Sequence, residues 1–195
     1  MPTTLDLLLR RIRPERTYDD AHRQADRVLA GFTLPRASIK SFHVFQECIA
    51  GFGARLEMCR LGTSDGIPAH RLYAWQRCVE LLRDVYRPGG ERAAFELART
   101  GQDGGLFRVL QDLAHAWAEA QALNEIRSVV NGFWNGLSPH RRREAAAEYL
   151  TKHSDLLPAE WSGAGADGLT HRMPELLAQH PQTLRRLRQA VRSGG

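Results

Sequence analysis

The stretch of sequence that decides the fold is residues 36–61, RASIKSFHVFQECIAGFGARLEMCRL. Its apolar side chains recur at steps of three and four residues, which is the spacing of one face of an α-helix. The members of this stripe are Ile39, Phe42, Phe45, Ile49, Phe52, Leu56 and Cys59. The spacing therefore predicts a long helix that buries one face.

Two glycines, Gly51 and Gly53, lie inside this stripe. Each glycine weakens a helix by about 1 kcal/mol relative to alanine, so its presence needs a compensating reason. We expect the two glycines to let another helix cross closely. A pocket for a ligand beside them is the alternative.

The same periodicity runs through almost the whole chain, and no segment alternates in the way a β-strand does. Pro14 is expected to end the first helix, and Ser138 with Pro139 is a strong helix start, a cap followed by a proline. The other expected helices cover residues 3–13, 17–31, 72–86, 91–99, 106–137 and 138 to about 153 or 156, followed by two short ones at 171–179 and 182–192.

The expected fold class is therefore all-α. We expect residues 1–157 to form a bundle of six to seven helices, residues 158–170 to form a linker, and residues 171–195 to form a small basic C-terminal helical appendage. The only apolar stripe of the last 14 residues is Leu184, Leu187 and Val191. That is too little to fold alone, so this segment must dock, bind a partner or stay mobile.

Composition narrows the class of protein. No apolar run approaches the ~20 residues that a membrane-spanning helix needs, and the first residues show no basic stretch followed by an apolar one. The three cysteines, Cys48, Cys59 and Cys78, form no CxxC pair, which suits a reducing compartment. We expect a cytoplasmic protein without membrane insertion.

Motifs for common catalytic chemistry are absent. The sequence holds no P-loop, no GxSxG elbow and no HExxH helix. Residues 163–168 spell GxGxxG, but no strand precedes them, so they are predicted to be a loop and not a dinucleotide site. These absences favour a protein that is not an enzyme and needs no cofactor.

One duplicated pattern supports a different interpretation. A carboxylate, a histidine and a second carboxylate follow each other at spacings of three and four, which places all three on one helical face. The two sets are Asp19, His22 and Asp26, and Asp112, His115 and Glu119. Two such helices facing each other could hold two ions of Fe, Mn or Zn in a dimetal bundle enzyme. Alternatively, the second set belongs to a solvated face.

Positive charge is concentrated towards the end of the sequence. Residues 1–137 carry 18 basic and 16 acidic residues, whereas residues 138–195 carry nine and six. Arg141, Arg142 and Arg143 follow the predicted helix start at Ser138, where cations oppose the helix dipole and could meet a phosphate. Pairing with Glu144 and Glu148 is the simpler explanation. A second basic group comprises Arg185, Arg186, Arg188 and Arg192.

The sequence as a whole therefore favours a non-enzymatic helical adaptor or subunit of a larger assembly. Its expected partner is nucleic acid or an acidic protein, contacted through the arginines at 141–143 and 185–192, because Arg side chains pair well with phosphate. The dimetal enzyme is the alternative.

Overall fold

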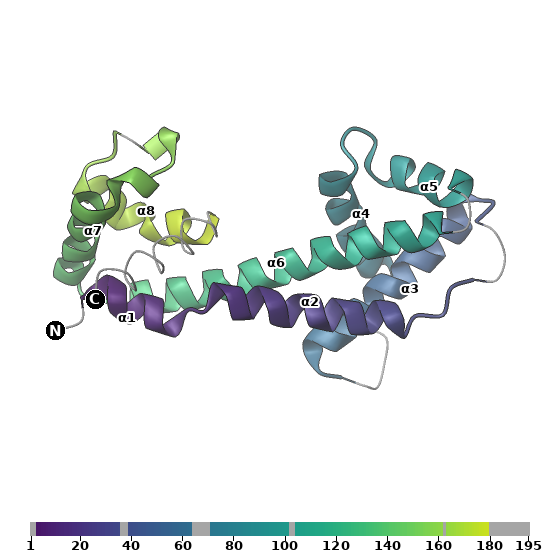
Figure 1. Ribbon diagram of the computed structural model, residues 1–195, viewed down its shortest axis with the longest axis horizontal. Helices are drawn as coiled ribbons and strands as arrows, with labels where there is room; N and C mark the ends of the chain where they lie inside the picture. Colours follow the sequence, from purple (N-terminus) through teal and green to yellow (C-terminus); the bar gives the residue numbers. More distant parts are fainter. Residues whose placement is uncertain (1–2, 36–38, 64–70, 102–103, 162, 180–195) are drawn as a thin grey trace. The chain divides into compact units, whose positions relative to one another are not determined.

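The computed structural model describes residues 3–35, 39–63, 71–101, 104–161 and 163–179, and this part of the chain contains helices and no strand (Figure 1). The expected all-α class is confirmed. The α-helices are α1 (Thr4–Arg11), α2 (Pro14–Ala30), α3 (Phe42–Leu61), α4 (Arg71–Val85), α5 (Gly90–Thr100), α6 (Gly105–Asn135), α7 (Pro139–His153) and α8 (Ala166–Gln179), with short 3-10 turns η1 (Ser154–Leu156) and η2 (Ala159–Trp161). No helix in the described ranges is both long and apolar enough to cross a bilayer.

The chain forms two compact units. Unit 1 is discontinuous and combines the described parts of residues 1–19 and 121–195, whereas unit 2 is residues 20–120. The unit boundaries fall inside α2 and α6, so each of these helices contributes residues to both units.

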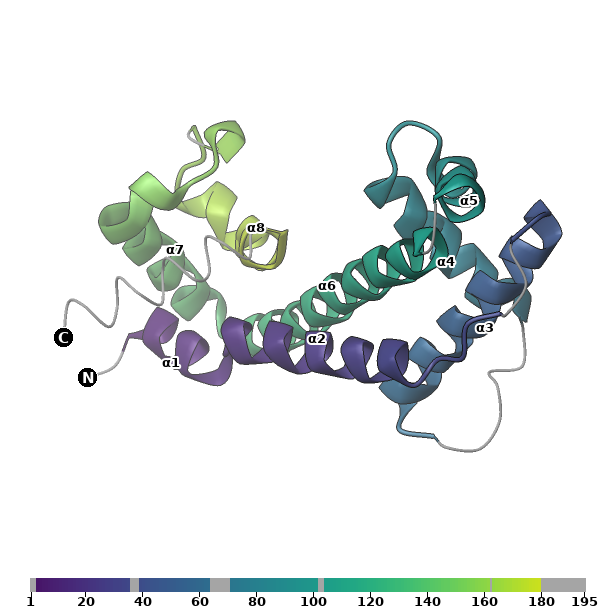
Figure 2. The ribbon, with the colours of Figure 1, turned by 45° about the vertical axis from the view of Figure 1, so that its right-hand side comes forward.

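The core of unit 2 is built on α3, which packs against α4 and α5 (Figure 2). The apolar stripe of α3 is confirmed as its buried face, because Phe45, Ile49, Phe52 and Leu56 are all fully buried. Ser41 caps the helix by accepting a hydrogen bond from the Val44 N–H, and Gly62 ends it in the left-handed conformation at φ 68°.

The two glycines of α3 have different surroundings. A Cβ atom at Gly53 would overlap the Cys78 sulfur of α4, whereas a Cβ at Gly51 would meet nothing within 4 Å. Close helix crossing therefore explains Gly53 and leaves Gly51 without a packing reason.

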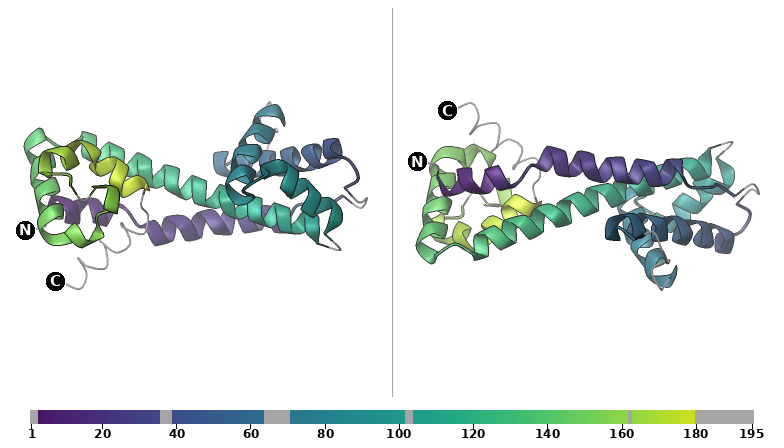
Figure 3. Two further views of the ribbon diagram at one scale, coloured as in Figure 1. Left: turned by 90° about the horizontal axis from the view of Figure 1, so that it is seen from above. Right: turned by 90° about the horizontal axis from the view of Figure 1, so that it is seen from below.

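Unit 1 holds α1, α7 and α8, and α7 packs against both of the others (Figure 3). Thr3 and Asp6 form a reciprocal capping box at the start of α1. Leu169, Met173, Leu176 and Leu177 of α8 are fully buried, and Trp134 of α6 donates a hydrogen bond to the Thr170 carbonyl at 3.0 Å. The apolar face of α8 thus belongs to the core of this unit.

Two boundaries differ from the expectation. Pro14 is the first residue of α2, where its missing N–H costs nothing, so the second helix starts three residues before Thr17. The last described helix begins at Ala166 and not near residue 171, because Leu169 supplies an additional buried contact. Part of the segment expected to be a linker is therefore helical. The helix expected at 182–192 lies outside the described residues.

Candidate functional sites

The arginines at the start of α7 lie in unit 1, and two of the three have partners within the protein. Arg142 donates from Nε to the Leu137 carbonyl at 3.1 Å and from its terminal nitrogen to the Asn135 carbonyl at 3.0 Å. Arg143 pairs with Asp167 at 3.0 Å. These contacts replace the pairs with Glu144 and Glu148 that the spacing favoured.

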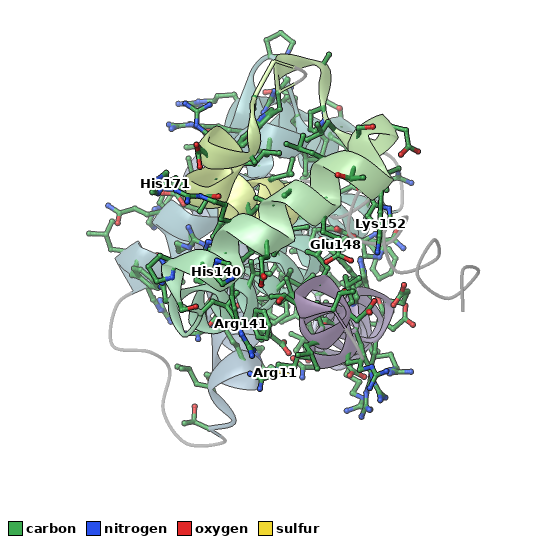
Figure 4. All side chains as sticks on the ribbon, turned by 90° about the vertical axis from the view of Figure 1, so that its left-hand side faces the viewer. Arg11, His140, Arg141, Glu148, Lys152 and His171 are labelled. Atoms are coloured by element: carbon green, nitrogen blue, oxygen red, sulfur yellow. The ribbon has the colours of Figure 1, made fainter. Side chains whose placement is uncertain are left out.

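Arg141 differs from its two neighbours. Its side chain is exposed, and no described residue pairs with its guanidinium (Figure 4). Arg11, the last residue of α1, is also exposed, and its guanidinium lies 5.2 Å from the centre of the Phe133 ring. Arg141 is therefore the member of the predicted trio that remains available to a ligand. The four arginines at 185–192 lie outside the described residues.

Truncation of Arg142 should cost stability, whereas truncation of Arg141 should not. Arg142→Ala removes two hydrogen bonds to carbonyls at and just beyond the end of α6, so we expect a loss of about 1–2 kcal/mol. Arg141→Ala, the matched control one position away, should stay within about 0.5 kcal/mol of the parent. Urea unfolding of both variants measures this, and equal stabilities would contradict it.

Four of the six predicted metal ligands lie together in unit 2. His22 Nε2 of α2 lies 2.8 Å from Glu119 Oε1 of α6, and His115 Nε2 of α6 lies 3.8 Å from Asp26 Oδ1 of α2. The two imidazole rings meet edge to face with centroids 5.4 Å apart. The cluster thus consists of two crossed acid–imidazole pairs, all of them partly solvent-exposed.

The other two predicted ligands have different surroundings. Asp112 accepts a hydrogen bond from the Tyr86 hydroxyl at 2.6 Å and pairs with Arg108 at 3.2 Å. Asp19 is exposed on α2, one turn before His22. In the described part of the chain, no three His, Cys, Asp or Glu side chains are arranged to hold a metal ion.

Two of the three cysteine thiols are buried and are not activated as nucleophiles. Cys48 and Cys78 are buried, and burial raises their pKa values to about 11 and about 12, with the charge of Glu57 adding to the effect at Cys78. A thiol with a raised pKa is a poor nucleophile at neutral pH, because the thiolate is the reactive form. Neither residue has the environment of a catalytic cysteine.

Native protein should therefore react with a thiol reagent at a single site. At pH 8 we expect an aromatic disulfide reagent to modify the partly exposed Cys59 rapidly, and Cys48 and Cys78 only after denaturation. The rapid phase should disappear in a Cys59→Ser variant. Rapid reaction of all three thiols in the native protein would contradict the burial.

Sequence reasoning missed a buried carboxylate in unit 2. Glu57 of α3 is 6% exposed, and its two oxygens accept hydrogen bonds from Trp117 Nε1 at 3.0 Å and from Arg60 Nε at 2.8 Å. A signal was available, because Glu57 stands four residues after Gly53 and so shares its buried row. With both oxygens satisfied, this carboxylate is a structural group.

The second missed feature is a pocket of about 370 Å³ between α3, α4 and α5. Phe42 and Trp75, both expected in the core, line it together with Gln46 and Gln76. Val79 and three charged side chains, Glu80, Arg83 and Glu91, complete its wall. Its volume falls in the range of ordinary ligand sites, and it does not include either glycine of α3.

Comparison of the chain with protein-family models, with curated proteins and with solved structures found no match.

Proposed function

We propose that this protein is a non-enzymatic helical adaptor that binds nucleic acid through its Arg-rich C-terminal segment. The observation that carries the proposal is the distribution of charge. Residues 1–179 hold 23 basic and 22 acidic residues, whereas the last 16 residues hold four arginines and no acid. Almost the whole net charge of +5 is thus concentrated in Arg185, Arg186, Arg188 and Arg192.

The pairing of the other arginines supports this assignment. Many of the arginines in the described ranges have acidic partners on the same helix, as Arg77 has Glu80 and Arg99 has Glu96. Arg142 and Arg143 are likewise engaged, so Arg141 alone of that trio joins the proposed binding surface. Binding through guanidinium groups and phosphates is driven by counterion release and does not depend on base sequence.

The test compares two variants with the same change in charge. The first replaces Arg185, Arg186, Arg188 and Arg192 with glutamine, and the second replaces Arg71, Arg77, Arg87 and Arg99, which pair with acids on the surface of unit 2. In mobility-shift titrations with a labelled duplex, the first variant should bind at least about tenfold more weakly than the parent, and the second within about threefold. If both variants lost the same affinity for the duplex, net charge alone would be responsible for binding, and the proposal would be overturned. Binding of an acidic protein but no duplex would assign the segment to a protein partner.

A dimetal enzyme is the second candidate, favoured by the proximity of His22, His115, Asp26 and Glu119. An ion would have to displace both acid–imidazole pairs to reach these ligands. Metal analysis of protein prepared without chelator tests it. Less than about one equivalent of Fe, Mn or Zn per chain, or a content unchanged by His115→Ala, would exclude this function.

A further inference from the structure

Two exposed arginines of unit 1, Arg11 and Arg141, come from helices that pack against each other. Arg11 is the last residue of α1, Arg141 lies in the first turn of α7, and α1 contacts α7. Figure 4 shows both side chains on the end of unit 1 that faces the viewer. Neither guanidinium has a hydrogen bond or an ion pair with a residue that the structure describes.

The carboxylates of α1 and α7 do not neutralise these two arginines, because each carboxylate is already engaged. Asp6, the only acid of α1, is held in the capping box at the start of that helix. On α7, Glu144 lies 3.1 Å from His140 Nε2, and Glu148 lies 3.1 Å from Lys152 Nζ. The two guanidinium charges therefore remain available, and an anion that contacts both of them reduces their mutual repulsion.

Arg11 is also positioned by an aromatic ring. Its guanidinium carbon lies 5.2 Å from the centre of the Phe133 ring, within the range of a cation–π contact. A guanidinium stacked on a ring uses its face for that contact and keeps the N–H donors in its plane free for a phosphate. The end of a helix favours a cation in any case, but that preference does not use these donors. A side chain that is held in place before binding loses less conformational freedom when the ligand arrives.

We propose that Arg11 and Arg141 form a second phosphate contact for the nucleic acid that binds the C-terminal arginines. The inference rests on the proposed function, because it assigns the phosphates to the same duplex. α8, which packs against α7, ends at Gln179, and Arg185 follows six positions later. Six extended residues span at most about 20 Å, which is less than one turn of duplex, about 34 Å. A duplex of two turns is therefore long enough to meet both sets of arginines.

The test measures duplex binding by full-length variants over a series of salt concentrations. Replacing Arg11 and Arg141 with glutamine should weaken binding at least about fivefold and lower the salt slope by about 1–2, since two phosphate contacts are lost. The matched control replaces Arg55 and Arg92, two exposed arginines of unit 2 that also stack on phenylalanine rings. The control has the same net charge and should bind within about twofold of the parent.

A variant with unchanged charge tests the role of the ring. Phe133→Leu removes the aromatic face beneath Arg11, so it should weaken duplex binding about two- to threefold and leave the salt slope unchanged. Arg11→Lys, which keeps the charge and loses the planar fork of donors, replaces it if Phe133→Leu does not fold. A steeper or shallower slope in the variant used would contradict a role in positioning alone.

The outcomes separate this inference from the proposed function. If the glutamine variant of the four C-terminal arginines loses binding and the Arg11 and Arg141 variant does not, the inference is overturned and the proposed function stands. The reverse pattern overturns the proposed function and leaves Arg11 and Arg141 as the phosphate contact. Equal losses in the Arg11 and Arg141 variant and in its control would assign the effect to net charge and overturn the inference.

Nuclear magnetic resonance of the arginine Nε–H groups distinguishes nucleic acid from free phosphate as the ligand. We expect the duplex to shift the Arg11 signal, which an Arg11→Lys variant assigns. Inorganic phosphate at the same ionic strength should shift it much less, because a single small anion forms fewer contacts than a duplex. A signal that responds to inorganic phosphate and not to the duplex would make the pair a site for free phosphate and overturn the inference.

Discussion

Replacing Gly53 with alanine is expected to lower the free energy of unfolding by about 1–3 kcal/mol, whereas the same replacement at Gly51 is expected to raise it by about 0.5–1 kcal/mol. Both residues lie inside α3, so the gain in helix propensity is the same at each. The difference arises from α4, because a Cβ at Gly53 overlaps the buried Cys78 sulfur and lies 3.4 Å from the Ala74 carbonyl oxygen. Urea unfolding of the two variants measures the contrast.

A second substitution identifies the cause. If the Cys78 sulfur is responsible, Gly53→Ala should cost at least about 1 kcal/mol less in a Cys78→Ala background than in the parent. The Gly51→Ala effect should be the same in both backgrounds. A stabilising Gly53→Ala change in the parent would show that α3 and α4 do not cross as closely as described.

Trp117→Phe is expected to destabilise unit 2 by about 2–4 kcal/mol. The change removes the indole N–H that donates to Glu57 at 3.0 Å, and the 6% exposure of Glu57 leaves little water to replace it. The smaller ring adds a cavity. Thermal or urea unfolding measures the loss.

A control in a second background separates the stability lost with the hydrogen bond from the stability lost to the cavity. In a Glu57→Gln background the acceptor is neutral, so Trp117→Phe should cost at least about 1 kcal/mol less than it does in the parent. Trp134→Phe, which breaks an indole hydrogen bond to a backbone carbonyl in unit 1, should cost less than Trp117→Phe. An equal cost of Trp117→Phe in both backgrounds would mean that packing alone is lost.

The local elements could be predicted from the sequence because each depends on neighbours along the chain. The stripe from Phe45 to Leu56 forms the buried face of α3, and Ser138 caps α7 through the Arg141 N–H as its spacing predicts. The position of Pro14 shows the limit of local rules, since a proline both ends one helix and is favoured in the first turn of the next.

The sites depend on contacts that periodicity does not encode. Glu57 and Trp117 are 60 residues apart, and Arg143 and Asp167 are 24 apart, so neither pair is visible from helix spacing. The pocket is a similar case, because Phe42 and Trp75 fit apolar stripes and their partial exposure depends on how α3, α4 and α5 pack together. His22 of α2 pairs with Glu119, and His115 pairs with Asp26 of α2. The second set of predicted ligands, which contains His115 and Glu119, is therefore partly exposed to solvent and also paired with α2.

The salt dependence of duplex binding tests the central claim most directly. The logarithm of the binding constant falls with the logarithm of salt concentration by about 0.9 for each phosphate neutralised. If Arg185, Arg186, Arg188 and Arg192 each neutralise one phosphate, the slope for the parent protein should exceed that of the four-fold glutamine variant by about 3–4. Equal slopes for the parent and that variant would show that these arginines do not contact nucleic acid.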